Sequence, residues 1–209
     1  MPPTAPLTFE EKGWSEGHEH VVGVDEVGCG PVAGPVVAAA VSLHRGQCFE
    51  GAVDSKLLTA KRREELAGRI REECLAYGLA AASCREVERL NVRSASILAM
   101  RRAVARLPFE PDLLLVDGRR APGLGPHTPI VGGDRRSHSI ACASILAKVV
   151  RDELMRRLGQ RYPQYGWASN KGYRTRAHMR ALQRFGPTPH HRTTFHGVLQ
   201  VELDLERKE

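Results

Sequence analysis

The chain has 209 residues, of which 42% are hydrophobic, and this is enough for one well-buried core. Lys and Arg number 31 against 24 Asp and Glu, so the net charge is +7, which favours an anionic partner such as nucleic acid. No uninterrupted apolar run reaches membrane-spanning length, and residues 1–20 lack the apolar segment of a signal peptide. We therefore expect a polar leader over residues 1–20, neither secretion nor membrane insertion, and one domain over residues 21–209.

Two strands open the predicted domain. Residues 21–27 and 34–43 are runs of β-branched or small apolar side chains, which is typical of buried strands. The intervening Gly28-Cys29-Gly30-Pro31 favours a tight loop, so we expect the two strands to be neighbours.

Helical spacing follows these strands. From Thr59 to Gly78, apolar residues recur at steps of four, four and three, which predicts an amphipathic helix with Thr59 as its N-cap. A third strand is expected over residues 79–84. A second helix follows, and Pro108 ends it.

The second half of the chain begins with residues 112–117, a short apolar run typical of a strand buried on both faces. We expect a brief strand around Ile130, a long helix from Ile140 to Leu158, and basic loops with shorter helices from about residue 162. Strands that alternate with helices predict an α/β domain with a mixed central sheet flanked by helices. The last residues, 198–209, suit a short helix.

Acidic residues lie where predicted strands give way to glycine: Asp25 and Glu26 before Gly28, Asp117 before Gly118, and Asp134 after Gly133. Each acid alone would more often be a turn or cap residue. Together they indicate a site for hard divalent cations, because carboxylates at strand ends are held by a rigid sheet. Side chains alternate along a strand, so Asp25 and Glu26 serve one site only if the strand ends or bulges there.

Three further motifs suit contacts to nucleic acid. Ser55 and Lys56, before a helix that starts with basic residues, would place a hydroxyl and a cation beside phosphate, although a plain turn explains them equally well. Lys171 and Tyr173 offer a cation and a stacking ring, or a loop aromatic packed on the core. His190-His191-Arg192 is either a second basic patch or a helix-end cap.

These motifs occur in the order found in bacterial ribonuclease HII, and the chain resembles that family from about Val21 to Gly197. The resemblance is carried by Val22-Gly23-Val24-Asp25-Glu26-Val27-Gly28, Gly30-Pro31, Gly34-Pro35-Val36, Asp54-Ser55-Lys56, Asn91, Leu115-Val116-Asp117-Gly118, Gly133-Asp134, Ala143-Ser144-Ile145-Leu146-Ala147-Lys148-Val149, Arg151-Asp152, Tyr162-Pro163, Gly166, Lys171-Gly172-Tyr173 and His190-His191-Arg192.

The resemblance implies a ribonuclease H-like fold with a helical C-terminal region. It implies an endonuclease that hydrolyses RNA in RNA/DNA hybrids and cuts 5′ of single ribonucleotides in duplex DNA, with two Mg²⁺ or Mn²⁺ ions, leaving 3′-hydroxyl and 5′-phosphate ends. The residues that it implicates are Asp25, Glu26, Asp117 and Asp134 as metal-binding catalytic acids, Gly28, Cys29 and Gly30 as main-chain contacts to the 2′-hydroxyl and phosphate, and Tyr173 packed on the next sugar. Cys29 stands where the family usually has a basic residue.

Five scattered cysteines without a Cys-x-x-Cys pair fit a reducing cytoplasm, and we expect a monomer. Two rival functions remain open. A different metal nuclease on the same fold would need the acids but not the glycine loop. A nucleic-acid-binding module without catalysis would bind tightly and show no metal-dependent turnover. A sugar-phosphate or nucleotide enzyme is disfavoured, because the chain lacks a Walker motif.

Overall fold

The structure, a computed structural model, describes residues 4–198, and these residues fall into two units. Unit 1 comprises the described residues of 1–27, 37–81 and 96–149. Unit 2 comprises residues 28–36, 82–95 and the described part of 150–209. The single domain expected over residues 21–209 stays a prediction.

A five-stranded mixed sheet forms most of unit 1. Its strands are β1 (Val21–Val27), β2 (Val36–Ser42), β3 (Ala76–Ala82), β4 (Leu113–Asp117) and β5 (Thr128–Ile130), in the order β3-β2-β1-β4-β5. β1 is antiparallel to β2 and parallel to β4, and β4 is parallel to β5. β1 and β4 are therefore central neighbours that end at the same edge.

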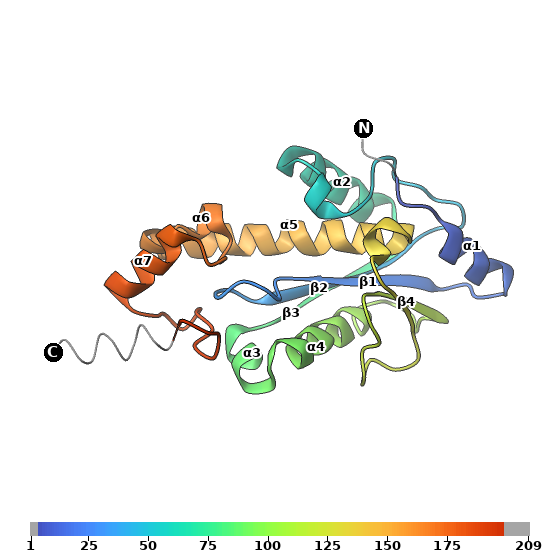
Figure 1. Cartoon of the computed structure of the whole chain (residues 1–209). Helices are drawn as coiled ribbons and strands as arrows, with labels where there is room; N and C mark the ends of the chain where they lie inside the picture. Colours follow the sequence, from blue (N-terminus) through green and yellow to red (C-terminus); the bar gives the residue numbers. More distant parts are fainter. Residues whose placement is uncertain (1–3, 199–209) are drawn as a thin grey trace. The chain divides into compact units, whose positions relative to one another are not determined.

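Helices cover both faces of this sheet. They are α1 (Thr8–Ser15), α2 (Ala60–Glu73), the later part of α4 (Val92–Val104) and the first half of α5 (His138–Arg161), with α4 and α5 on opposite faces (Figure 1). A Cβ at Gly23 of β1 would overlap the main chain at Ser139 and Ile140, so α5 packs directly on the strand. Glu10 of α1 is fully buried and accepts hydrogen bonds from the Ser137 hydroxyl and from the Ser139 hydroxyl and N–H.

Unit 2 has a core of its own, built around aromatic side chains. It contains α3 (Cys84–Leu90), the second half of α5, α6 (Trp167–Asn170) and α7 (Arg176–Phe185). Tyr165 and Trp167 stack with ring centroids 5.2 Å apart and pack with Met155, Leu182 and Val32.

All five predicted strands are present, and the long helix is α5. The helix predicted over Thr59–Gly78 ends at Glu73, because Cys74 is already extended and Gly78 belongs to β3. The N-cap is confirmed: the Thr59 side chain accepts from the Arg62 N–H. The helix expected over residues 198–209 falls, except for its first residue, outside the described part of the chain.

Two helices were not predicted. α1 lies within the polar leader, and α3 follows a capping box in which Ser83 and Glu86 bond to each other's main chain. The Ser-x-x-Glu spacing of that box was a signal in the sequence. No helix among residues 4–198 is long and apolar enough to cross a membrane.

Candidate active site

Strand pairing places two of the predicted acids side by side in unit 1. Val24 of β1 pairs with Val116 of β4 in parallel register, so the next residues, Asp25 and Asp117, are neighbours at the ends of the two strands. The Asp117 carboxylate accepts a 2.7 Å hydrogen bond from the Gly133 N–H. This bond ties Asp117 to the 3₁₀ turn Gly133–Arg135, which carries Asp134.

Burial and like charges dominate the electrostatics of these acids. Asp25 is only 6% exposed, and burial, followed by the charges of Glu26 and Asp117, raises its pKa well above the ordinary value. Burial, followed by the charges of Asp54 and Asp117, also raises the pKa of Asp134. Carboxylates that repel one another in this way are stabilised by a bound cation.

The acids fit a divalent cation by their chemistry, since carboxylate oxygens are the ligands that Mg²⁺ and Mn²⁺ prefer. Among the described residues, however, no three His, Cys, Asp or Glu side chains form a ready-made metal site. Charge therefore argues for a cation here, while the spacing of the side chains does not by itself define its ligands.

The strand carries Asp25 and Glu26 without a bulge and ends at Val27, one residue after Glu26. The register of β1 with β2 runs unbroken from Val22 to Val27, so Asp25 and Glu26 project to opposite faces of the sheet. Of the two conditions under which both acids could serve one site, a bulge is absent, and the strand ends at Val27 immediately before the turn at Gly28. The Glu26 N–H instead donates a 2.7 Å hydrogen bond to the Asp25 carboxylate.

Two buried serines, Ser55 and Ser144, lie next to Asp25 and are linked to it by hydrogen bonds. Ser144 of α5 hydrogen-bonds to the Asp25 carboxylate, and its hydroxyl oxygen lies 3.1 Å from that of Ser55. In the 3.1 Å bond the Ser144 hydroxyl donates to the Ser55 oxygen, so Ser144 links Ser55 to the acid. Ser55 is thus buried beside the acids rather than presented to solvent.

Positive charge borders the acids on the same unit. Arg135 donates a 2.8 Å bond to Asp54, and the Lys56 N–H donates to the same carboxylate. Burial alone would raise the pKa of Asp54, but these bonds and the charges of Lys56 and Arg135 hold it below the ordinary value. The Lys56 side chain is exposed, as its predicted phosphate contact requires.

The glycine loop lies in unit 2, and a single side chain holds it. The buried guanidinium of Arg192 makes five hydrogen bonds of 2.7–3.1 Å to the carbonyl oxygens of four loop residues, which are Gly28, Cys29, Pro31 and Gly34. A guanidinium has five N–H groups, which matches the number of bonds that Arg192 makes to this loop.

This anchoring determines which way the loop N–H groups point. In a trans peptide the N–H of one residue is opposed to the carbonyl of the residue before it. Because the Gly28 and Cys29 carbonyls face Arg192, the N–H groups of Cys29 and Gly30 point away from it. Two adjacent N–H groups directed outward are suited to bind a hydroxyl or phosphate oxygen.

Arg151 connects this loop to the predicted stacking residue. It donates to the carbonyls of Pro35, Ala33 and Lys171, and a side chain at Gly28, where φ is +102°, would collide with it. Tyr173 is 46% exposed, and its ring lies 3.7 Å from the position of a Cβ at Gly30. The Lys171 ammonium donates to the Ala168 carbonyl within the same unit.

A profile of the family Ribonuclease HII matches residues 22–198. The chain belongs to the ribonuclease HII family. The Ribonuclease HII of Cereibacter sphaeroides is 51% identical over 203 residues, which cover 95% of each chain. The ribonuclease H2 of Pyrococcus horikoshii has a TM-score of 0.77 at 23% identity, and covers 90% of this chain and 99% of that one. Bst-RNase HIII, solved in complex with Mn²⁺, has a TM-score of 0.66 at 19% identity, and covers 90% of this chain and 70% of that one.

Family membership confirms the predicted fold class and the assignment as a ribonuclease that cleaves RNA paired to DNA. Within each unit, the structure brings together several of the residues predicted for this ribonuclease HII site. Asp25, Asp117, Asp134, Ser55 and Lys56 lie in unit 1, whereas Gly28, Cys29, Gly30, Lys171 and Tyr173 lie in unit 2. Glu26, also in unit 1, lies next to Asp25 along β1.

The motif His190-His191-Arg192 was interpreted wrongly. Arg192 and His191 are buried, so they form neither an exposed basic patch nor a helix-end cap. Burial, followed by the neighbouring His178 and His190, lowers the pKa of His191 to about 3. No local pattern indicated this role, because a cation beside two histidines suggests exposure. The loop carbonyls that require the guanidinium lie about 160 residues earlier in the chain.

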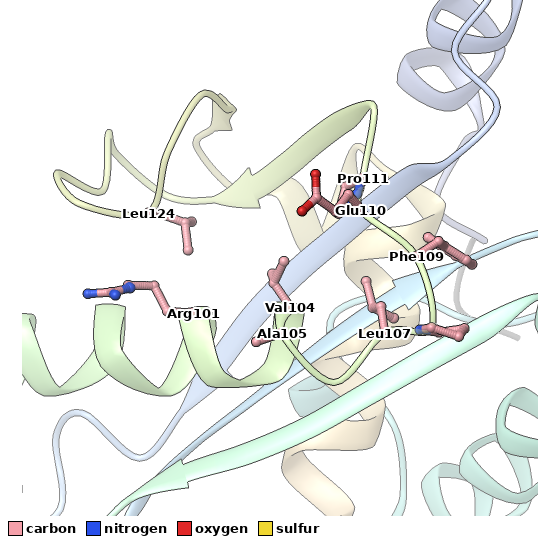
Figure 2. Close-up of a pocket in the computed structure, with 9 residues that line it drawn as sticks. Arg101, Val104, Ala105, Leu107, Phe109, Glu110, Pro111 and Leu124 are labelled. Atoms are coloured by element: carbon pink, nitrogen blue, oxygen red, sulfur yellow. The ribbon is translucent and has the colours of Figure 1, made fainter.

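A pocket of about 650 Å³ in unit 1 is not part of this site (Figure 2). Its walls are mostly apolar, including Val104, Leu107 and Phe109, and it carries one positive and one negative side chain, Arg101 and Glu110. None of the acids or motif residues predicted for the ribonuclease HII site lines it. A pocket without excess positive charge is poorly suited to a phosphate backbone.

Proposed function

We propose that this chain hydrolyses the RNA strand of RNA/DNA hybrids and incises 5′ of single ribonucleotides in duplex DNA, with two Mg²⁺ or Mn²⁺ ions and 3′-hydroxyl and 5′-phosphate products. The observation that carries the proposal is the pairing of Asp25 with Asp117 at the ends of adjacent strands, where burial and repulsion raise the pKa of Asp25. Family membership and the Mn²⁺ complex of Bst-RNase HIII support the choice of metal.

Bound divalent ions would activate a water molecule and stabilise the leaving oxygen of the phosphodiester. Asp25, Asp117 and Asp134 would hold them through carboxylate oxygens. Glu26, which projects to the other face of β1, would reach the same ions around the end of the strand at Val27. Ser144 and the Glu26 N–H fix the Asp25 carboxylate before any ion binds. Lys56 would attract the phosphate chain.

Recognition of the ribonucleotide would fall to the glycine loop. The N–H groups of Cys29 and Gly30 are directed away from Arg192 and would bind the 2′-hydroxyl, the one group that distinguishes RNA from DNA at that residue. Tyr173 would pack on the adjoining sugar. The five free cysteines support the expectation of a reducing cytoplasm, where we propose that the chain acts as a monomer.

The test compares both ends of one strand. Asp117→Asn should abolish cleavage of a labelled duplex with one internal ribonucleotide, because Asp117 ends β4 beside Asp25. Asp112→Asn, just before the same strand, should retain activity, because Asp112 bonds to the N–H groups of Glu19 and His20 and pairs with the His20 ring, away from the acids. An all-DNA duplex and EDTA should give no product. Tight binding without cleavage under Mg²⁺ and Mn²⁺ would identify a binding module instead.

A further inference from the structure

A row of arginines follows the exposed side of α7 in unit 2. Arg176, Arg180 and Arg184 succeed one another at steps of four residues, and all three are exposed. Residues four apart lie on the same side of a helix, and each step advances by about 6 Å. The three guanidinium groups therefore share one side over about 12 Å of helix.

The orientation of this row is fixed by the packing of α7. His178, Ala181 and Leu182 are buried on the opposite side of the helix, so the arginine side must face solvent. The α7 sequence contains no acidic residue that would neutralise the row. Arg156 and Arg157 on α5 differ in this respect, because both form ion pairs with Glu153.

The row begins beside the proposed substrate contact at Tyr173. Trp167 Nε1–H donates to Nε2 of His178, so the other ring nitrogen, Nδ1, carries the proton and donates to the Tyr173 carbonyl at 2.9 Å. Thr175 caps the helix by accepting from the His178 N–H. These bonds tie the exposed tyrosine to the first turn of α7, which carries Arg176.

We propose that Arg176, Arg180 and Arg184 bind backbone phosphates of the duplex that flanks the nucleotide at Tyr173. The inference rests on the proposed function of that tyrosine. Guanidinium groups pair with phosphate oxygens through two parallel hydrogen bonds, and such contacts carry no sequence information. The row therefore binds nucleic acid without regard to sequence or sugar, and recognition of the ribonucleotide remains with the glycine loop.

The experiment measures the salt dependence of binding in EDTA. Two fluorescent duplexes of one sequence are used, one all-DNA and one with a single ribonucleotide. The variant Arg176→Gln/Arg180→Gln is compared with the charge-matched control Arg156→Gln/Arg157→Gln, and Arg184→Gln is added in a triple variant. Glutamine maintains helix propensity, and circular dichroism verifies folding.

We expect the slope of log K against log salt to become shallower by about 0.9 per arginine removed from α7, or about 1.8 for the double variant. At 0.15 M salt, this corresponds to a loss of about fivefold in affinity per arginine, equal for both duplexes. In the control variant Arg156→Gln/Arg157→Gln, the slope and the affinity should change little. Equal effects of the α7 and control variants, or no change in slope, would overturn the proposal. Because no cleavage is needed, failure of the proposed function would leave this result interpretable.

Discussion

The acids at the edge of the sheet in unit 1, Asp25 and Asp117, and the glycine loop of unit 2 are held in place by different kinds of contact. We call the first of these regions the acid edge. Main-chain pairing of β1 with β4 places Asp25 beside Asp117, so local strand patterns suffice to position the acids. The glycine loop is positioned by side chains, since Arg192 and Arg151 hold its carbonyls from distant parts of the chain. The acids should therefore tolerate changes around them that leave the strands intact, whereas the loop depends on single residues.

The largest expected effect is at the acid edge. Asp25→Asn should lower the rate of cleavage by on the order of 10³-fold or more, since metal-assisted catalysis is worth several kcal/mol. The same change should raise the melting temperature in EDTA, because it removes a buried carboxylate that Glu26 and Asp117 repel. Activity assays and calorimetry measure the two effects.

The comparison with added metal sharpens this prediction. Mg²⁺ should raise the melting temperature of the unmodified chain and have little effect on Asp25→Asn, because binding to the folded state stabilises it. A variant that melts lower in EDTA and responds to Mg²⁺ as before would show that Asp25 has only a structural role.

The second-largest effect is expected from a substitution of Arg192, the side chain that holds the glycine loop. Arg192→Lys should lower the free energy of unfolding by roughly 3 kcal/mol, because three N–H donors cannot serve four buried carbonyls. Selectivity for the ribonucleotide duplex over the all-DNA duplex should fall as the loop relaxes. Urea unfolding and paired cleavage assays measure these changes. Arg157→Lys, at an exposed arginine paired with Glu153, is the control and should alter neither.

A smaller change is expected from restoring the basic residue that the family usually has in the loop. Cys29→Arg should tighten binding of the ribonucleotide duplex by about tenfold, the value of one charge-assisted hydrogen bond to phosphate. The charge of Arg192, close enough to interact with Cys29, opposes a larger gain. Binding titrations with Cys29→Ser as the control measure the effect. Weaker binding by Cys29→Arg would contradict this prediction and show that the loop of this chain accommodates the substrate better with a thiol at residue 29.

The smallest effect concerns pH and the buried histidines beneath Tyr173. With a folded pKa of about 3, His191 stays neutral between pH 6.5 and pH 3 while the unfolded chain takes up a proton. Stability should therefore fall as the pH drops through this window. His191→Gln should reduce the difference in melting temperature between pH 7 and pH 4.5.

Sequence reasoning succeeded where local pattern determines structure. The two strands that carry Asp25 and Asp117 were predicted from their short apolar runs, and the start of α2 was predicted from Thr59, whose side chain caps the helix. It failed where contacts between residues far apart in the chain determine the burial of a side chain or the end of a helix. The burial of Arg192 depends on carbonyls about 160 residues earlier, and the end of α2 depends on Gly78 joining the sheet. The nearby glycines made a deformation of β1 at the acids plausible, and only the pairing with β2 shows that the register continues to Val27.

The burial of Glu10 bears on where this folding unit begins. The family profile starts at residue 22, yet Glu10, upstream of it, is the acceptor for Ser137 and for the N–H and hydroxyl of Ser139. A carboxylate at this position also complements the positive end of the α5 dipole. Residues outside the recognisable motif thus belong to the cooperative structure, and a fragment cut at the profile boundary would lose the cap of the helix that supports Asp25.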